Sequence, residues 1–352
     1  MRWIDGLEAA AAEKLPEAVH RYFRQGSAGG VSVGEAVAAW SSYRFRPRVL
    51  TDVSSISTAT TVLGTPVAGP VLVAPTTLQR QADPDGEAAM SAGVAAAGSV
   101  LGVSSNAGTT YAEIAAAGAP WWLQIYVTRN RDYTRQMLDA AVAAGARAVV
   151  LTADTPVVGR KEDDGPTVWE VVQPGHLRAN VDESAYSDDD LAKADDLTPD
   201  VIGWLHEQTD LPVVVKGILR GDDARRCVDA GAAGLIVSNH GGRQLDGAVA
   251  TAYALPEVVQ AVPGTEVFVD GGIRRGEHVL AALALGARAV FVGRPALWAL
   301  TVGSSPGVTR LLTDLYDELA HALALAGVPT PAAVTPDLVA AASSCRVPGA
   351  DH

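Results

Sequence analysis

The stretch from residue 212 to residue 295 contains four short apolar runs, and each of them ends in glycine or in polar residues. The runs are PVVVKG (212–217), GLIVSNHGG (234–242), EVFVDGG (266–272) and AVFVGRP (289–295). Short apolar runs without polar alternation predict strands that are buried on both faces, as in a parallel sheet. The alanine-rich segments between them end at or just before glycine, which is typical of helices.

Four more runs of the same kind lie upstream, so the chain holds eight β-then-α units. They are VLVAP (71–75), VLGVSS (100–105), WWLQIYV (121–127) and AVVLTAD (148–154). Eight units over about 250 residues predict a (β/α)8 TIM barrel. A doubly wound sheet is disfavoured because no GxGxxG follows the first strand. We expect one domain over residues 1–352, with an N-terminal helical cap (1–65) and a long loop after the fourth strand.

Residues 161–200 carry much of the net charge. The chain has 27 Lys and Arg against 40 Asp and Glu, a net charge of −13, and twelve of these acids but only three of these bases fall in this segment. The segment follows the fourth strand, at the end of the barrel where active sites lie. A long polar segment there is either a lid or a solvated loop, and we expect an acidic lid.

The composition excludes several classes of protein. The acid excess argues against nucleic-acid binding, which needs clustered lysine and arginine. No apolar run reaches the ~18 residues that span a bilayer, and the N-terminus mixes charged with apolar residues, unlike a signal peptide. Cys227 and Cys345 are far apart, which argues against a disulfide scaffold or a zinc site. We expect a cytoplasmic protein with no metal ion and no nucleic-acid or membrane partner.

Polar residues gather where the predicted strands end. Among them are Gln124, Tyr126, Thr152, Asp154, Lys216, Ser238, His240 and Asp270. Glycine-rich turns follow the last two strands, with Arg274 and Arg294 beside them. Such turns present backbone N–H groups to an anion, and barrels often bind phosphate there. The turns by themselves fit FMN and a phosphorylated substrate equally.

The string SNHGGRQLD (238–246) resembles the signature of the FMN-dependent 2-hydroxy acid oxidases and dehydrogenases, which include glycolate oxidase, lactate oxidase and mandelate dehydrogenase. Further matching strings occur in family order over nearly the whole chain. They are YRFRPRVL (43–50), VLVAPTTLQRQADPDGE (71–87), LQIYV (123–127), LTADTP (151–156), VVVKGI (213–218), VDGGIRRG (269–276) and VGRP (292–295). The resemblance implies that FMN is bound and that a 2-hydroxy acid is oxidised to the 2-oxo acid. It also implies oxygen or another electron acceptor and a homo-oligomer, often a tetramer.

The resemblance assigns roles to individual residues. His240 would be the catalytic base, Asp154 its carboxylate partner, and Lys216 a catalytic cation beside flavin N1 and O2. The substrate would meet Tyr22, Arg243 and Tyr126, the last also counted as catalytic. The other cofactor-binding residues would be Ala74, Pro75 and Thr76 at the flavin edge, Ser104, Gln124, Thr152 and Ser238 on the ring or ribityl chain, and Asp270, Gly272, Arg274, Gly293 and Arg294 at the phosphate.

The chemistry of the residues supports the role of His240 independently. Oxidation of a 2-hydroxy acid removes two electrons and two protons, and a neutral imidazole is a suitable base. A buried carboxylate such as Asp154 would orient the ring and stabilise the imidazolium. The alternative for His240 is a hydrogen-bonded core histidine. Whether carbon loses a hydride to flavin N5 or a proton to His240 stays open.

The chain departs from the family pattern at residues that would contact the substrate. The family usually has a second carboxylate-binding arginine after the fourth strand, whereas here Lys161 holds the matching position after Gly159 and Arg160. A lysine cannot form the bidentate fork, so either Arg160 replaces it through a one-residue shift or the substrate is held differently. Thr77 stands where the family has Ala or Gly, which would narrow the space near flavin N5 or restrict oxygen.

The loop after the fourth strand is also shorter than is usual and lacks an Asn-x-Phe string, reading EDDGPTVW (162–169). Acids at the mouth would repel an anionic substrate. The sequence therefore predicts a bulky or atypical 2-hydroxy acid, less charged or partly cationic. The alternatives are another phosphate-binding barrel enzyme, such as an FMN isomerase or a nucleotide-type dehydrogenase, and an FMN-binding protein with a diverged substrate or without hydroxy acid turnover.

Overall fold

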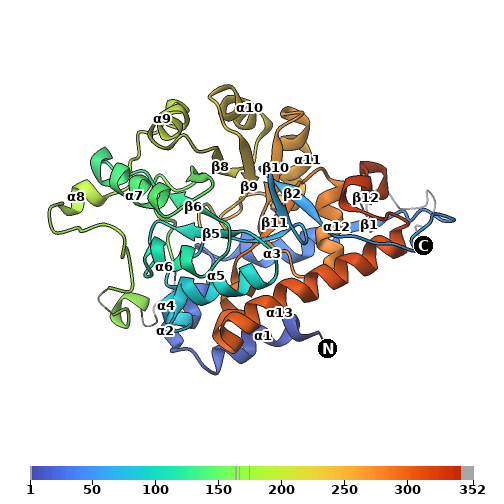
Figure 1. Cartoon of the computed structure of the whole chain (residues 1–352), viewed down its shortest axis with the longest axis horizontal. Helices are drawn as coiled ribbons and strands as arrows, with labels where there is room; N and C mark the ends of the chain where they lie inside the picture. The colour runs from blue at the N-terminus through green and yellow to red at the C-terminus, as the bar shows by residue number, and fades with distance from the viewer. Residues whose placement is uncertain (1, 163–164, 166, 174, 342–352) are drawn as a thin grey trace.

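The computed structural model describes residues 2–162, 165, 167–173 and 175–341. Eight parallel strands close into a barrel, with helices around it (Figure 1). The strands are β4 (Val71–Val73), β5 (Leu101–Ser104), β6 (Trp121–Ile125), β7 (Val149–Thr152), β8 (Val213–Ile218), β9 (Gly234–Val237), β10 (Glu266–Val269) and β11 (Ala289–Val292). Each strand coincides with one of the eight apolar runs, so the predicted (β/α)8 fold is confirmed.

Helices follow the strands and cover the outside of the barrel. They are α4 (Gln79–Ala82), α5 (Gly86–Ala96), α6 (Tyr111–Ala116), α7 (Arg131–Ala143), α9 (Asp200–Thr209), α10 (Gly221–Asp229), α11 (Thr251–Ala261), α12 (Gly276–Ala284) and α13 (Arg294–Ala326). The long helix α13 contains a kink, because Gly303 and Ser304 have non-helical backbone angles. Within the described ranges, no helix is both long and apolar enough to cross a membrane.

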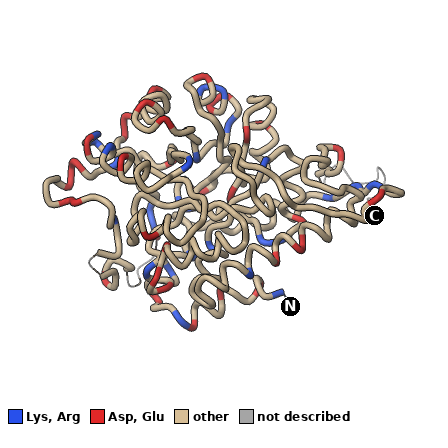
Figure 2. Tube along the Cα trace, viewed as in Figure 1, with Lys and Arg blue, Asp and Glu red and all other residues tan. Residues whose placement is uncertain are grey.

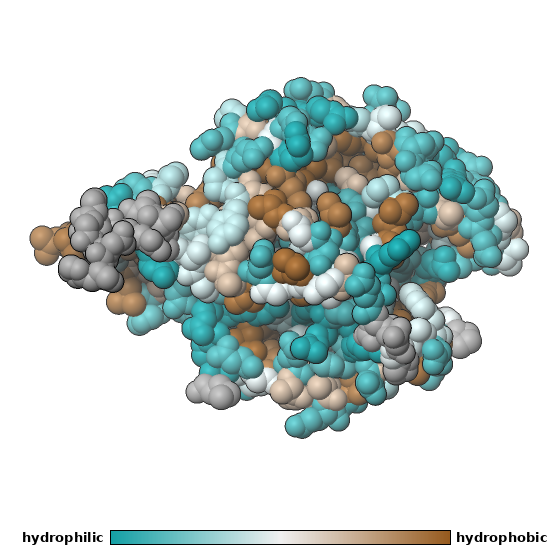
Figure 3. Space-filling model, turned by 180° about the vertical axis from the view of Figure 1, so that it is seen from behind, coloured by the Kyte–Doolittle hydropathy of each residue, from teal (hydrophilic) through white to brown (hydrophobic). Residues whose placement is uncertain are grey.

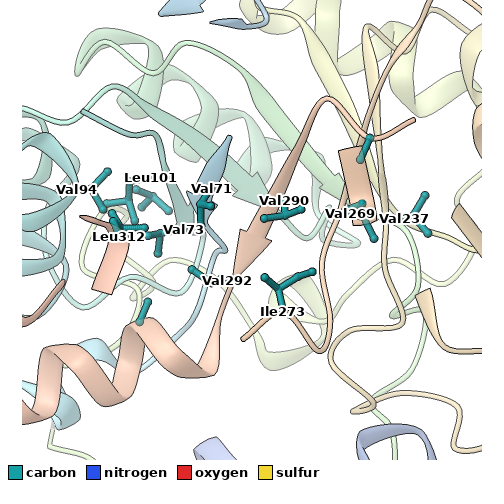
Figure 4. Packing of buried hydrophobic residues seen from close by; sticks show 14 of the residues in the cluster. Val71, Val73, Val94, Leu101, Val237, Val269, Ile273, Val290, Val292 and Leu312 are labelled. Carbon is teal, nitrogen blue, oxygen red and sulfur yellow. The ribbon is translucent and has the colours of Figure 1, made fainter. Parts of the chain in front are cut away.

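The strand side chains alternate between two apolar layers. On β4, Leu72 belongs to the inner layer of the barrel. Val71 and Val73 belong to the outer layer, where Figure 4 shows them near Leu101 and the helix residues Val94 and Leu312. Aromatic rings fill the barrel axis, with centroids 5.4 to 6.0 Å apart and edge-to-face contacts among Trp122, Phe268 and Phe291. Burial on both faces explains why the strands are apolar throughout.

The N-terminal region is helical only in its first two thirds, in α1 (Trp3–Ala12), α2 (Glu17–Arg24) and α3 (Val31–Ser41). The expectation of a helical cap through residue 65 is wrong beyond α3. There the chain forms β1 (Tyr43–Phe45), which pairs with β12 (Val339–Ala341), and a hairpin of β2 (Thr60–Val62) and β3 (Thr65–Val67). The hairpin is rich in β-branched residues, which favour strands. Its Val62 and Val67 join the inner layer of the barrel.

Candidate active site

A cavity of about 590 Å³ opens at the carboxyl ends of the strands, and this volume is typical of small-molecule sites. The strand register determines which side chains reach it, because residues two apart on a strand share a face. On β8, Val214 belongs to the inner layer and Lys216 lines the cavity. In the same way, Phe268 of β10 belongs to the inner layer, and Asp270, two positions later, lines the cavity. The polar residues at the strand ends therefore converge on one space.

Most of the predicted site residues line this cavity. They are Tyr22, Ala74, Pro75, Thr76, Ser104, Gln124, Tyr126, Thr152, Lys161, Lys216, His240, Arg243, Asp270, Gly272, Arg274, Gly293 and Arg294. Asp154, Ser238 and Arg160 do not line it. Arg160 is exposed, and its carbonyl oxygen accepts a hydrogen bond from Ala28 N. Of Arg160 and its neighbour Lys161, only Lys161 faces the cavity, which favours Lys161 over Arg160 as a ligand of the substrate.

His240 and Asp154 form a pair at the cavity wall. His240 Nδ1 lies 3.0 Å from Asp154 Oδ1. A carboxylate only accepts, so Nδ1 holds the proton and Nε2 keeps its lone pair. Burial and the charge of Lys216 lower the pKa of His240 below its ordinary value, although Asp154 opposes them. Burial by itself would raise the pKa of Asp154, but the hydrogen bond and charge of His240 hold it below the usual range.

The backbone at His240 is held in an uncommon conformation. Its φ of 58° lies in the left-handed region, which is unfavourable for a residue with a side chain. His240 N donates to Ser238 Oγ over 3.1 Å. The same hydroxyl accepts from Lys216 Nζ over 2.8 Å, and Ser238 is fully buried. Ser238 thus links Lys216 to His240, and its hydroxyl proton is left to donate to another group.

Lys216 is a buried cation in the inner wall of the cavity. Its Nζ lies 3.2 Å from Asp270 Oδ2. Burial by itself would lower the pKa of Lys216, but the charges of Asp270 and Asp154 raise it above its ordinary value. Lys216 is thus a permanent positive charge that projects into the cavity.

Two partly buried arginines mark the other end of the cavity. Burial lowers the pKa of Arg274, and burial together with Arg243 lowers that of Arg294. Neither arginine forms an ion pair with a carboxylate in the part of the chain that the structure describes. Gly272, with φ of 80°, and Gly293, before the first residue of α13, add backbone N–H groups and a helix N-terminus. Two partly buried cations without a carboxylate partner favour an anion, so this end of the cavity is suited to bind one.

The rest of the cavity wall offers hydrogen-bond donors and positive charges to a second ligand, apart from the anion bound near Arg274 and Arg294. Arg243 lies 4.8 Å from the centre of the Tyr22 ring, and its Nη1 donates to Tyr22 O over 2.7 Å. Lys161 Nζ donates to Arg243 O over 2.8 Å. Burial and the two arginines Arg243 and Arg294 lower the pKa of Lys161 to about 8. Burial raises the pKa of Tyr126, so its hydroxyl keeps its proton at neutral pH.

The acidic segment (161–200) does not place carboxylates over the cavity. Figure 2 shows its acids along the projecting segment around α8 (Asp188–Leu191), with basic residues beside them. Asp189 and Asp195 pair with Arg129, and Asp196 pairs with Arg131. Asp163 and Asp164 lie outside the described residues. The residues of this segment that line the cavity are Lys161, Thr167, Val168, Trp169 and Lys193.

The described part of the segment therefore reaches the cavity, but the acidic lining that the sequence predicted is not found among the described residues. Asp189, Asp195 and Asp196 pair with Arg129 and Arg131, and Glu183 pairs with Arg178. Asp270 is the only acid in the described lining, and it already faces Lys216. The free charges that face the cavity are positive, which favours anionic ligands.

Sequence reasoning missed Trp169 and Lys193. Trp169 is 60% exposed and meets the Tyr22 ring edge-on, with centroids 5.9 Å apart. Lys193 lies over the Tyr126 ring, 3.6 Å from its centre. In the sequence, the signal for each was weak: one tryptophan and one lysine within a strongly polar segment. Only the fold shows that both reach the cavity.

This fold and cavity define a class of protein: (β/α)8 enzymes that bind an anionic cofactor beside a His–Asp pair. Residues 11–341 match the family model "FMN-dependent dehydrogenase". L-lactate oxidase from Nostoc is 41% identical, over 91% of this chain and 93% of its own length, and human 2-hydroxyacid oxidase 1 is 40% identical, over 92% of each. A crystal structure of mandelate oxidase superposes with a TM-score of 0.87 at 38% identity, over 96% of this chain and 97% of the other. The chain belongs to the FMN-dependent dehydrogenase family and is an FMN-dependent oxidoreductase.

The residues present fit FMN. Arg274 and Arg294 supply partly buried positive charge that a phosphate would neutralise. Asp270 Oδ1 is buried with no hydrogen-bond partner among the described residues, and a ribityl hydroxyl could donate to it, whereas a phosphate could not. Lys216 offers a cation to the anionic reduced ring. Thr77 lines the cavity too, and its buried hydroxyl also has no partner in the described ranges.

Proposed function

We propose that the protein oxidises a 2-hydroxy acid to the 2-oxo acid, with His240 as the catalytic base. The observation that carries the proposal is the His240–Asp154 pair beside a cavity with a cationic wall and an anion site. The names of the relatives, which include lactate and 2-hydroxyacid oxidases, support the same chemistry. Oxygen or another carrier would accept the electrons.

Bound FMN would supply the acceptor for two electrons. His240 Nε2 would take a proton from the substrate, and Asp154 would stabilise the resulting imidazolium. Arg243 and Lys161 would bind the substrate carboxylate, and the Tyr22 and Tyr126 hydroxyls would orient it. Because a lysine offers one point charge rather than a fork, this carboxylate would be held by Arg243 from one side and Lys161 from another.

The basic test is a panel of 2-hydroxy acids added anaerobically to the purified protein, followed by the flavin absorbance. We expect a yellow protein that at least one acid bleaches. A colourless protein that takes up no FMN would contradict the family assignment. A yellow protein that no 2-hydroxy acid bleaches would favour FMN binding with a diverged substrate or without hydroxy acid turnover.

The pH dependence of flavin reduction follows from the lowered pKa of His240. A base must be neutral, so its activity is present above the pKa and lost as the pH falls through it. Because burial lowers that pKa below the ordinary value of 6.5, the decline of kcat/KM with falling pH should have its midpoint below pH 6.5. Stopped-flow reduction over a pH series measures this. A decline centred above pH 7 would contradict the assignment.

Replacing Lys161 with methionine should raise the KM for 2-hydroxy acids about tenfold or more, because a charged hydrogen bond to the carboxylate is lost. Lys161→Arg should retain tight binding, since it keeps the charge. Arg160→Met is the matched control, because the Arg160 side chain is exposed outside the cavity. Equal KM values for Lys161→Met and the unsubstituted protein would remove Lys161 from the substrate site.

We also propose a homo-oligomer, by resemblance a tetramer, located in the cytoplasm. Exposed apolar side chains support assembly, and Figure 3 shows apolar residues toward the middle of one face inside a hydrophilic rim. Leu50, Leu245 and Tyr253 are more than half exposed. Cys227 is a free thiol, which fits a reducing compartment, and Cys345 lies outside the described residues. Light scattering of the purified protein measures its mass in solution.

A further inference from the structure

Lys193 reaches the cavity through a short backbone bridge. Residues 192–194 run antiparallel beside residues 127–129, which continue β6, with Thr128 opposite Lys193. Ala194 N donates to Val127 O over 2.9 Å, and Arg129 N donates to Ala192 O over 2.8 Å. This pairing holds Lys193 beside the carboxyl end of β6 and directs its side chain over the Tyr126 ring.

Acidic residues on both sides of Lys193 stabilise this bridge through contacts on the outside of the barrel. Arg129 pairs with Asp189 on one side of Lys193 and with Asp195 on the other. Asn130 Nδ2 donates to Asp190 Oδ1 over 3.0 Å. The acidic residues therefore hold the segment against the barrel while the lysine between them points the opposite way, into the cavity. Because these acids bond to Arg129 and Asn130, none of the three pairs with Lys193.

The Lys193 ammonium has no carboxylate partner among the described residues, and its one polar contact there is the face of Tyr126, 3.6 Å from the ring centre. Its side chain is partly buried. Burial lowers the pKa of Lys193 to about 8, so the amine is still mainly protonated at neutral pH. A half-buried cation that faces a ligand cavity without an anion is suited to bind one.

Lys193 and Lys161 contact different residues of the cavity wall. Lys161 Nζ donates to Arg243 O over 2.8 Å, whereas Lys193 Nζ lies over the ring of Tyr126, directly after β6. The cavity thus offers one cationic group around Arg243 and a second, separate cation at Lys193.

We propose that Lys193 binds a second carboxylate of the substrate, so that this protein prefers 2-hydroxy dicarboxylic acids. This inference rests on the proposed function, in which Arg243 and Lys161 bind the carboxylate next to the hydroxyl group. A second carboxylate at the other end of the molecule meets Lys193. A neutral or cationic end group finds no such partner, since Asp270 is the only acid in the described lining and already pairs with Lys216.

The test compares 2-hydroxypentanedioate with 2-hydroxypentanoate, which share a five-carbon chain and differ only in the terminal carboxylate. Anaerobic flavin reduction is measured over a range of substrate concentrations. The unsubstituted protein should show a KM about tenfold or more lower for the diacid. Lys193→Met should abolish that preference by raising the KM for the diacid, with the KM for the monoacid unchanged within about twofold.

Lys14→Met is the matched control, because Lys14 is an exposed lysine that donates to Val302 O far from the cavity. It should alter neither KM. Unchanged FMN content and unchanged monoacid reduction show that Lys193→Met is folded. The proposal is overturned if Lys193→Met leaves the diacid KM unchanged, or if it raises both KM values equally, which would place Lys193 at the shared 2-hydroxy acid end. If neither acid bleaches the unsubstituted yellow protein, although other 2-hydroxy acids do, the preference for diacids fails while the proposed function stands.

Discussion

Replacing His240 with asparagine is expected to slow flavin reduction by a 2-hydroxy acid by about 10²- to 10⁴-fold, the usual contribution of a general base. FMN should stay bound, because the FMN anion site is built from other residues. Asparagine is the better substitution here. The φ of 58° at this position is tolerated by asparagine more readily than by alanine, so the turn before Gly241 keeps its shape. The measurement is the stopped-flow rate of flavin bleaching at saturating substrate.

His206→Asn is the matched control for this prediction. His206 is an exposed histidine on α9 whose Nδ1 lies near Leu211 O, away from the cavity. Its substitution should leave the bleaching rate unchanged. Asp154→Asn should keep FMN and still slow the reaction strongly, because an amide can hold the imidazole in the wrong tautomer. A His240→Asn protein that bleaches at the normal rate would exclude His240 as the base.

Replacing Arg274 with methionine is expected to weaken FMN binding by about tenfold to 150-fold, as the loss of a charged hydrogen bond in a buried site does. Arg274 suits this test better than Arg294. The Arg294 guanidinium also donates to Phe23 O, Gln25 O and Gly241 O, so its removal would disturb the backbone around the cavity. Among the described residues, Arg274 Nη1 donates only to the neighbouring Ile273 O.

Riboflavin has the same ring as FMN but lacks the phosphate, so comparing the two ligands shows which part of FMN Arg274 binds. If Arg274 binds the phosphate, Arg274→Met should weaken FMN binding and leave riboflavin binding unchanged, as fluorescence titration of deflavinated protein would measure. Arg275→Met is the matched control, since Arg275 is the exposed neighbour outside the cavity lining. Equal losses for FMN and riboflavin would mean that Arg274 acts through the fold rather than through the phosphate.

Local sequence patterns predicted the barrel because each strand of a closed parallel sheet is buried on both faces and must be apolar throughout. They also predicted the glycine turns and most of the cavity lining, since residues such as Lys216 and Asp270 follow inward-facing core residues by two positions. The N-terminal hairpin was not predicted. Its short strands are stabilised by the barrel interior, through Val62 and Val67, rather than by any periodicity of their own.

The direction in which charged side chains point was decided by contacts between distant segments. Arg160 and Lys161 are neighbours in the chain, yet only Lys161 faces the cavity. The acids of the segment 161–200 predicted a negative mouth, but Asp189, Asp195 and Asp196 pair with Arg129 and Arg131, which lie some sixty residues earlier in the chain.

The sequence by itself determined the class of fold, the family and the set of polar residues at the strand ends, because these depend on spacing along one strand or turn. The tertiary structure decided which of those groups share the cavity and which sign of charge the substrate meets. The physical reason is that a charge acts through the partners it finds in space. Asp189 and Asp195 find Arg129 and are neutralised outside, whereas Lys193 between them finds Tyr126 and stays a cation inside.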